Sequence, residues 1–378
     1  MRFASKNALF LLTAVIFGLA WLRIPFSKPR SGFTPPIVHA SRAESPLYAD
    51  RLVSHETTPQ VHAPTVAELS DGRLRAFWYG GTHEGTRDVA IYTSVYEPET
   101  REWGLEATVF DRRSTQTEVQ RYVKMLGNPV AFRYADREIW LFYVSVSVGG
   151  WSGSAINLAV SQDDGQTWSP PRRLVTSPFL NLSTLVKGPA LMLESGGVAL
   201  PAYHEFIGVF GELLQLDTEG SVVGKTRLSR GASSLQPVIL PRSTSHAMSL
   251  MRYAGAPPNR ILAVRTADGG AHWTPPWKID LPNPNAAVAG TRLDDGSLMV
   301  VFNDSEKDRG DLSLAVSSED GETWRTIHRF EEDPSGSDEY SYPFLIRSSD
   351  GDYHLLYTWQ RTHIKHVHFN HAWLEGTR

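Results

Sequence analysis

The sequence predicts an all-β protein: a six-bladed β-propeller of four-stranded antiparallel blades, preceded by an N-terminal export or anchor segment. Three observations lead to this fold class. One strand pattern recurs about every 50 residues from His62 onward, and a turn motif ending in tryptophan occurs three times. Turn residues also interrupt every later window before helical periodicity builds up. Repeated units of four strands around an axis form a β-propeller.

The first 44 residues fit a signal peptide or membrane anchor followed by a Pro-rich linker. Arg2 and Lys6 precede an apolar run over residues 8–22, which Arg23 closes, as in an export signal. The run is short for a bilayer span, which takes ~20 apolar residues. Residues 38–40 (VHA) offer a late cleavage site, and the pattern fits a cleaved signal as well as an uncleaved anchor. Residues 45–378 are therefore expected to form one exported propeller, periplasmic or extracellular, or held at the inner membrane.

Each predicted blade begins with a strand that carries a proline near its start. The six starts are His62-Ala63-Pro64, Gly127-Asn128-Pro129, Lys187-Gly188-Pro189, Leu235-Gln236-Pro237, Asn283-Pro284-Asn285 and Ser341-Tyr342-Pro343. Asp-Gly and Gly-Gly dipeptides at 71–72, 196–197, 295–296 and 350–351 predict the hairpin turns that follow. The last unit is too short for four strands. The segment around residues 52–57 is predicted to supply the missing strand and to close the ring.

The turn motif is S-x-D-x-G-x-T-W at residues 161–168, with close variants at 266–273 and 317–324. Its spacing has a local reason, because the carboxylate caps backbone N–H groups of its own turn and glycine takes the positive φ. The tryptophan then packs the hairpin onto its blade. These carboxylates are interpreted as structural elements of the turns and not as catalytic groups.

Composition excludes several classes of function. With 37 Lys and Arg against 41 Asp and Glu, and no basic block, the chain is not predicted to bind nucleic acid. The absence of cysteine excludes disulfide scaffolds, thiolate zinc sites and cysteine nucleophiles. Histidines gather at 363, 366, 368 and 371, but alternate residues of a strand face opposite sides, so they are interpreted as packing or surface groups. No metal and no cofactor are predicted.

The three turn motifs are Asp boxes, and with the six-fold repeat the chain resembles the sialidase (neuraminidase) superfamily, in particular bacterial sialidase-like proteins with BNR/Asp-box repeats. The resemblance covers residues 62–366. It implies a substrate carboxylate bound by three arginines, a tyrosine nucleophile paired with a glutamate, and an aspartate as acid/base. A phenol avoids the repulsion that a carboxylate nucleophile would meet beside a carboxylated anomeric carbon.

Propeller topology indicates the face that carries the site. First-strand starts and the loops between second and third strands lie on one face, whereas the Asp boxes lie on the other. The first-strand starts contribute His62, Asn128, Lys187, Gln236, Asn285 and Tyr342. The loops contribute Glu84, Asp88, Tyr203, His204, Glu205, Arg252, Asn303, Asp304, Arg309 and Arg361. Convergence of these polar groups on one funnel predicts a small-ligand site.

Residue roles follow from the resemblance and from position in the repeat. Asp88 corresponds to the acid/base, Glu205 to the glutamate partner, and Tyr340 or Tyr342 to the nucleophile. The substrate-binding candidates are His62, Glu84, Asn128, Lys187, His204, Gln236, Arg252, Asn303, Arg309 and Arg361. Where the superfamily has Arg-Ile-Pro in its first blade, this chain has His62-Ala63-Pro64. Imidazole donates fewer hydrogen bonds than guanidinium, which changes carboxylate recognition here.

Three functions fit these patterns. The leading prediction is a sialidase-like exo-glycoside hydrolase that acts on a terminal sugar, acidic or neutral, of extracellular or cell-envelope glycans. A polysaccharide lyase acting on uronates would use His62, His204 and tyrosines as bases. A non-catalytic glycan-binding propeller would use the aromatic residues as stacking platforms. Convergence of Arg252, Arg309 and Arg361 beside His62 would favour a carboxylated substrate. The partner is in each case a glycan or oligosaccharide, and the oligomeric state is left open.

Overall fold

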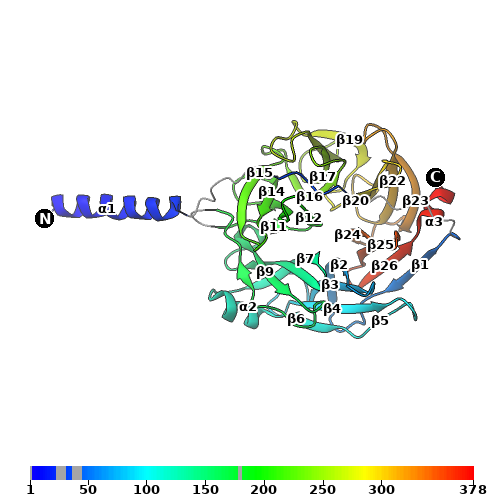
Figure 1. Ribbon diagram of the computed structural model, residues 1–378, viewed down its shortest axis with the longest axis horizontal. Coiled ribbons are helices and arrows are strands. Elements are labelled where there is room, and N and C mark those ends of the chain that lie inside the picture. The colour runs from blue at the N-terminus through cyan, green and yellow to red at the C-terminus, as the bar shows by residue number, and fades with distance from the viewer. Residues whose placement is uncertain (1, 23–30, 36–44, 178–180) are drawn as a thin grey trace.

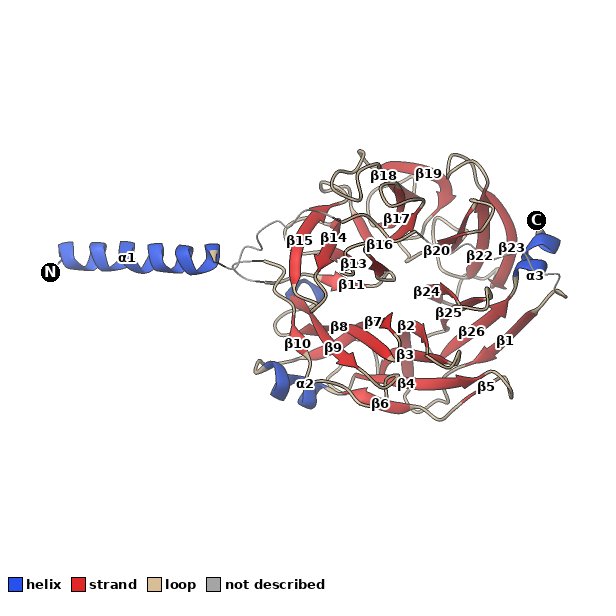
Figure 2. Ribbon diagram, in the orientation of Figure 1, coloured by secondary structure: helices blue, strands red, loops and turns tan. Residues whose placement is uncertain are grey.

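The computed structural model describes residues 2–22, 31–35, 45–177 and 181–378. Within these ranges the strands form six antiparallel sheets that follow one another around an axis, as Figure 1 shows. In Figure 2 the α-helices lie at the outside of this ring of sheets. The predicted all-β, six-bladed propeller is therefore confirmed.

Blades one to three follow the chain in order. Blade one contains β2 (Gln60–Glu68), β3 (Leu74–Gly81), β4 (Ala90–Glu97), β5 (Glu102–Trp103) and β6 (Ala107–Phe110). Blade two contains β7 (Met125–Ala135), β8 (Glu138–Val146), β9 (Ser154–Ser161) and β10 (Arg172–Arg173). Blade three contains β11 (Leu185–Val186), β12 (Leu191–Met192), β13 (Val198–His204), β14 (Phe210–Leu216) and β15 (Val222–Arg227).

Blades four to six complete the ring. Blade four contains β16 (Ser234–Pro241), β17 (Ala247–Tyr253), β18 (Arg260–Thr266) and β19 (Trp277–Pro282). Blade five contains β20 (Ala289–Arg292), β21 (Leu298–Phe302), β22 (Asp311–Ser317) and β23 (Arg325–Glu332). Blade six contains β24 (Tyr340–Arg347), β25 (Tyr353–Trp359), β26 (His363–Phe369) and β1 (Tyr48–Leu52). The helical segments are α1 (Arg2–Trp21), α2 (Arg112–Val119), α3 (His371–Thr377) and one 3-10 turn, η1 (Trp151–Gly153).

Blade six is closed by strand exchange between the two ends of the propeller. β1 pairs antiparallel with β26, with Tyr48 opposite Phe369 and Leu52 opposite Lys365. The predicted exchange is confirmed, but its predicted position at residues 52–57 is wrong, because the paired strand ends at Leu52. Glu56 has a φ of 60°, and the chain turns there toward β2. The closing strand hides the edge of β26 that would otherwise be open to other chains.

The Asp boxes are structural turns, as predicted. In the first box one carboxylate oxygen of Asp163 accepts the N–H groups of Gln166 and Thr167, at 3.0 and 2.8 Å. Gly165 has a φ of 80° at the sharpest point of that turn. The tryptophan of this box, Trp168, packs edge-on against Phe77 at 5.7 Å between ring centroids. The box therefore fastens its hairpin to the neighbouring blade.

The inner strands of four blades are interrupted at the predicted X-Pro sites. Their register shifts lie between His62 and Thr65, Gly127 and Val130, Leu235 and Val238, and Ser341 and Phe344. The residue before each proline has a positive φ, namely 50° at Ala63, 42° at Asn128, 51° at Gln236 and 55° at Tyr342. In blade three the same break separates β11 from β12. Such bulges redirect side chains out of the regular alternation of a strand, and here they supply the polar residues of the funnel.

The N-terminal helix α1 stands clear of the ring (Figure 2), and its apolar side chains are exposed, with 77% for Phe10 and 72% for Trp21. No helix in the described part of the chain combines the length and apolar character needed to cross a membrane. The cleavage site at 38–40 lies outside the described residues. Export, anchoring and the domain boundary at residue 45 stay predictions.

One short segment that precedes residue 45 belongs to the propeller core. Phe33 is fully buried between blades three and four, where it packs with Leu193, Leu213 and Ile239. Its N–H donates to the carbonyl oxygen of Thr244 at 2.9 Å. The Pro-rich linker of the prediction therefore includes a residue that fills the seam between two blades.

Candidate active site

The funnel floor receives one side chain from each blade. These are the six residues that the first-strand starts predicted: His62, Asn128, Lys187, Gln236, Asn285 and Tyr342. All but Asn285 and Tyr342 are buried, with 2–4% of each residue exposed. In five blades a bulge or break of the inner strand accompanies the floor residue, and in blade five Asn285 precedes β20 with a positive φ of 56°.

A chain of hydrogen bonds joins blades two to five across the floor. The phenol oxygen of Tyr203 accepts from Nδ2 of Asn128 at 3.0 Å and from Nε2 of Gln236 at 3.4 Å. Oε1 of Gln236 accepts from NH1 of Arg252 at 3.2 Å, and Nε of Arg252 donates to Oδ1 of Asn285 at 2.6 Å. Burial and the nearby Glu205 raise the pKa of Tyr203 well above its ordinary value, so this phenol stays neutral. The network fixes Arg252 in place.

Tyr342 lies where three cations meet. Its phenol oxygen is 3.5 Å from NH1 of Arg252. Nζ of Lys187 and the guanidinium carbon of Arg309 both lie 5.9 Å from the centroid of its ring. Burial lowers the pKa of Lys187 to about 7, and its ammonium donates to the carbonyl oxygen of Pro343 at 3.0 Å. The phenol of Tyr342 therefore lies in a cationic part of the funnel floor.

His62 lies next to Tyr342 and is buried without a hydrogen-bond partner. Its ring centroid is 4.4 Å from that of Tyr342 and 5.7 Å from that of Tyr79. Among the described residues, neither ring nitrogen has a partner. Burial, reinforced by Arg361, lowers the pKa of His62 to about 3, so the imidazole is neutral. A buried polar group without a hydrogen-bond partner needs an explanation, and a role in ligand binding provides one.

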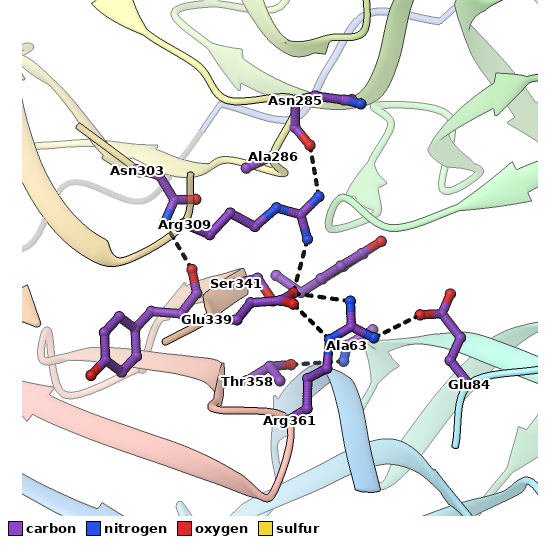
Figure 3. Close-up of polar contacts among 12 residues, drawn as sticks. Ala63, Glu84, Asn285, Ala286, Asn303, Arg309, Glu339, Ser341, Thr358 and Arg361 are labelled. Atoms are coloured by element: carbon purple, nitrogen blue, oxygen red, sulfur yellow. Dashed lines mark hydrogen bonds and ion pairs between the residues drawn. The ribbon is translucent and has the colours of Figure 1, made fainter. Parts of the chain in front are cut away.

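Two arginines of the funnel hold one carboxylate between them, as Figure 3 shows. Arg361 donates from Nε to Oε2 of Glu339 at 2.6 Å and from NH2 to Oε1 at 3.3 Å. Arg309 donates from NH1 to Oε1 of the same glutamate at 2.9 Å. NH1 of Arg361 also reaches Glu84 at 3.1 Å. Two of the three predicted arginines therefore meet on a carboxylate of the protein itself, whereas Arg252 lies beside Tyr342.

Local backbone geometry explains the position of Arg361. The tip of the hairpin between β25 and β26 has positive φ at two successive residues, 50° at Gln360 and 58° at Arg361. Thr362 N–H closes this turn on the carbonyl oxygen of Trp359 at 3.1 Å. Two non-glycine residues in this conformation carry strain, which surrounding contacts must hold. The carbonyl oxygen of Arg361 accepts from Val61 N–H at 2.8 Å, which ties the hairpin to blade one.

The two predicted catalytic carboxyls, Asp88 as acid/base and Glu205 as partner of the nucleophile, differ in their environments. Burial raises the pKa of Glu205, and the nearby Arg252 only partly opposes this. Asp88 instead turns into its own loop, where Oδ2 accepts from N and Oγ1 of Thr82, both at 2.7 Å. Hydrogen bonds from the side chains of Thr86 and Thr82 lower the pKa of Asp88 to about 2. Glu205 is therefore the better proton donor at neutral pH.

Three other predicted residues lie away from the cluster. Tyr340 packs between blades five and six, and its phenol donates to Asp338 at 3.1 Å. Asn303 is fully buried and donates to the carbonyl oxygen of Tyr340 at 2.8 Å, which links two blades (Figure 3). His204 accepts from the N–H of Ile207 at 3.0 Å and supports its own loop. These three residues hold strands and a loop around the funnel in place.

Sequence reasoning missed two members of the site, Glu339 and Tyr79. Glu339 immediately precedes the blade-six strand that carries Tyr342, and Tyr79 lies near the end of the second strand of blade one. Both positions satisfied the topological rule that selected the other candidates. A search for acidic residues beside first-strand starts would have found Glu339.

A cavity of about 820 Å³ lies outside the funnel, between the edges of blades three and four. Lys225, Arg227, Arg230 and Trp273 are among its lining residues. It contains none of the residues that meet at Tyr342. We place the candidate site at the funnel because polar groups converge there from all six blades, and four of the six floor residues are buried. Within the described residues, no group of three or more His, Asp or Glu side chains could hold a metal ion.

Comparison with solved structures supports the fold. The Hadza microbial sialidase Hz136 matches with a TM-score of 0.69 and 16% identity, over 87% of this chain and 69% of that one. An α-L-arabinanase of Penicillium chrysogenum, solved with arabinobiose, matches with a TM-score of 0.62 and 14% identity, over 86% and 98% of the two chains. A Dyadobacter fermentans protein of unknown function matches with a TM-score of 0.69 and 13% identity, over 85% and 97%.

No curated protein matches the chain. The family model for the BNR repeat-like domain matches residues 72–355, which span the propeller from the first hairpin turn of blade one to β25 of blade six. The sialidase and the arabinanase among the similar structures share the fold of this chain. This chain is a member of the family of BNR repeat-like domains.

Proposed function

We propose that this protein is an exo-acting glycoside hydrolase that releases a terminal sugar from extracellular or cell-envelope glycans, with Tyr342 as its nucleophile. The observation that carries the proposal is the position of Tyr342, whose phenol faces Arg252 at 3.5 Å on a floor built by six blades. A phenol in a cationic funnel is suited to attack a sugar at its anomeric carbon. A small pocket of about 10 Å³ beside it is lined in part by His62, Tyr79, Glu84 and Arg361.

The proposed reaction has two steps. In the first, the phenolate oxygen of Tyr342 forms a bond to the anomeric carbon while the glycosidic bond breaks, and Glu205 gives its proton to the leaving oxygen. In the second, Glu205 takes a proton from water, whose oxygen attacks the anomeric carbon and releases Tyr342. Burial raises the pKa of Glu205, which suits a group that first donates a proton and then takes one back. Glu205 also interacts electrostatically with Arg252, whose NH1 lies beside the phenol oxygen of Tyr342.

A panel of chromogenic sialosides, arabinofuranosides and other glycosides, analysed by mass spectrometry, tests this proposal. We expect release of a single sugar by the wild-type protein and none by Tyr342→Phe. If no glycoside is cleaved, or if the variant retains full turnover, the proposed hydrolase is wrong. Binding without turnover that survives alanine at both Tyr342 and Glu205 would instead identify a glycan-binding propeller.

The neutral, unpartnered imidazole of His62 favours one alternative, a polysaccharide lyase. A neutral imidazole can remove the proton next to a uronate carboxyl group, which starts an elimination. That reaction leaves an unsaturated sugar that absorbs ultraviolet light, whereas hydrolysis does not. An increase in absorbance with a uronate polysaccharide, lost in His62→Gln, would select the lyase.

We also propose that the propeller works outside the cytoplasm, because residues 2–22 combine a charged start with an exposed apolar helix. Fractionation of cells that express the full chain tests this. Recovery in the cytoplasmic fraction would contradict it, and recovery with the membrane would indicate an uncleaved anchor.

A further inference from the structure

We propose that Glu339 is a built-in carboxylate that occupies the arginine pair, so that the funnel selects neutral sugars and rejects carboxylated ones. This inference rests on the proposed function, since it names the substrate class of the same site. It concerns the arginines that the resemblance assigns to carboxylate binding. Three groups of observations support it.

The first group is the commitment of the arginine donors. All three nitrogens of Arg361 have carboxylate partners, with Nε and NH2 on Glu339 and NH1 on Glu84. Arg309 donates one terminal nitrogen to Glu339 and the other to the carbonyl oxygen of Asn285, at 2.7 Å. The bidentate fork that would hold a substrate carboxylate already holds one. A second carboxylate would have to displace Glu339.

The second group is the charge of Glu339. Burial tends to raise its pKa, but hydrogen bonds from Arg361 and from Ser341, at 2.7 Å, outweigh this and lower the pKa to about 2. Glu339 is therefore ionised throughout the neutral range. Together with Glu84 it balances the charges of Arg309 and Arg361. A carboxylated sugar bound to the same arginines would place a further negative charge beside Glu339. Two adjacent carboxylates repel each other strongly in a partly buried site.

The third group is the set of groups left for the ligand. Both ring nitrogens of His62 are buried without a partner among the described residues, so one donor and one acceptor stay unsatisfied there. NH2 of Arg252 has no hydrogen-bond partner among the described residues, whereas Nε and NH1 are both engaged. A neutral imidazole at the position where the superfamily has arginine matches sugar hydroxyl groups, which both donate and accept. A carboxylate only accepts, so it would leave half of this capacity unused.

Binding of free sugars tests the inference without any need for turnover. Isothermal titration would compare N-acetylneuraminate and D-glucuronate with L-arabinose and D-galactose, for the wild type and Glu339→Gln. We expect the wild type to bind at least one neutral sugar about 10-fold or more tightly than either acid. Glu339→Gln should gain about 10-fold or more in affinity for the acids, because it frees two guanidinium groups.

Matched variants keep the test sharp. Glu322→Gln makes the same change at an Asp-box turn, where Glu322 pairs with Arg265, and it should change neither affinity. Glu339→Asp keeps the negative charge and should keep the wild-type preference for neutral sugars. It is the second variant to measure if Glu339→Gln does not fold. Tighter binding of acids by the wild type, binding of no neutral sugar, or an unchanged preference in Glu339→Gln would each overturn the inference. Loss of turnover alone would count only against the hydrolase.

Discussion

NH1 of Arg252 lies 3.5 Å from the phenol oxygen of Tyr342, and the same nitrogen donates to Gln236 at 3.2 Å. This arginine therefore joins the floor of blade four to the tyrosine of blade six. Its Nε is held by Asn285 of blade five. The proposed nucleophile faces a cation whose position is fixed from two other blades, so its reactivity depends on the closed ring and not on blade six alone.

The two tyrosines of blade six are expected to respond differently to loss of the hydroxyl group. Tyr342→Phe should lower kcat/KM by at least about 10³-fold, because the nucleophile is removed. Tyr340→Phe should leave kcat/KM within about 3-fold and cost ~1 kcal/mol of unfolding free energy, since it loses only its bond to Asp338. Steady-state kinetics and urea denaturation of both variants measure this. The opposite ranking would move the nucleophile to Tyr340.

Glu205 should control the alkaline side of the pH–rate profile. A general acid must be protonated, so kcat/KM should fall as pH rises through the raised pKa of Glu205, above its ordinary value of 4.5. Glu205→Gln should lose about 10²- to 10⁴-fold in kcat/KM and should remove that limb of the profile. An unchanged limb in the variant would assign the acid role to another group.

Asp88 is expected to matter much less than the resemblance implies. Its carboxylate accepts two hydrogen bonds from Thr82, and its lowered pKa of about 2 leaves no proton to donate at neutral pH. Asp88→Asn should reduce kcat by less than about 10-fold. A loss as large as that of Glu205→Gln would show that the loop turns Asp88 toward the substrate during the reaction.

The seam between blades six and one should lose stability in acid. Trp103 Nε1, which can only donate, bonds Nδ1 of His366 at 3.3 Å, so the proton of His366 lies on Nε2 and points to His354 at 3.0 Å. Burial, reinforced by His368, lowers the pKa of His354 to about 3, and His366 is also shifted well below its ordinary value. Both rings are therefore neutral in the folded state.

The sign of the effect follows from linkage. The unfolded histidines bind protons below about pH 6.5 and the folded ones do not, so stability is complete above that pH and falls as pH decreases toward 3. At pH 5 the loss is about 2 kcal/mol for each such histidine. Urea unfolding at pH 7.5 and pH 5 measures it, and His354→Gln should reduce the difference. Equal stability at both pH values would contradict the neutral chain.

Phe33 should contribute to stability although it precedes the predicted domain. Phe33→Ala should lower the free energy of unfolding by about 3–5 kcal/mol, because the ring fills the space between Leu193, Leu213 and Ile239. A chain that begins at residue 45 should show a similar loss in denaturant unfolding. If that truncated chain is as stable as the full one, the seam closes without Phe33.

The fold was predictable because its signals are local. The Asp boxes, the Asp-Gly turns and the X-Pro starts each depend on a few adjacent residues, and the structure places them as expected. The closing strand was misplaced because its partner is more than 300 residues away, and nothing in its own sequence sets the register with β26. The burial of Phe33 was hidden for the same reason.

The site was predictable in outline only. The six floor residues were found because each stands within two residues of a proline at a known point of the repeat. The choice between Tyr340 and Tyr342 required the bulge at Tyr342, which alters the alternation of side chains along β24. Glu339 was overlooked because its importance lies in its ion pairs with Arg309 and Arg361. These arginines are 30 and 22 residues away from it in the chain.

The interrupted inner strands have a consequence for how such a ring can change over time. Each interruption is confined to a few residues around a proline, and regular pairing resumes on the far side, as between Thr65 and Phe77 in blade one. Exchange of the floor residue in one blade therefore leaves the ladders of the other five untouched. The floor residues can therefore be replaced one blade at a time. A new ligand specificity can evolve in this way while the propeller scaffold stays the same.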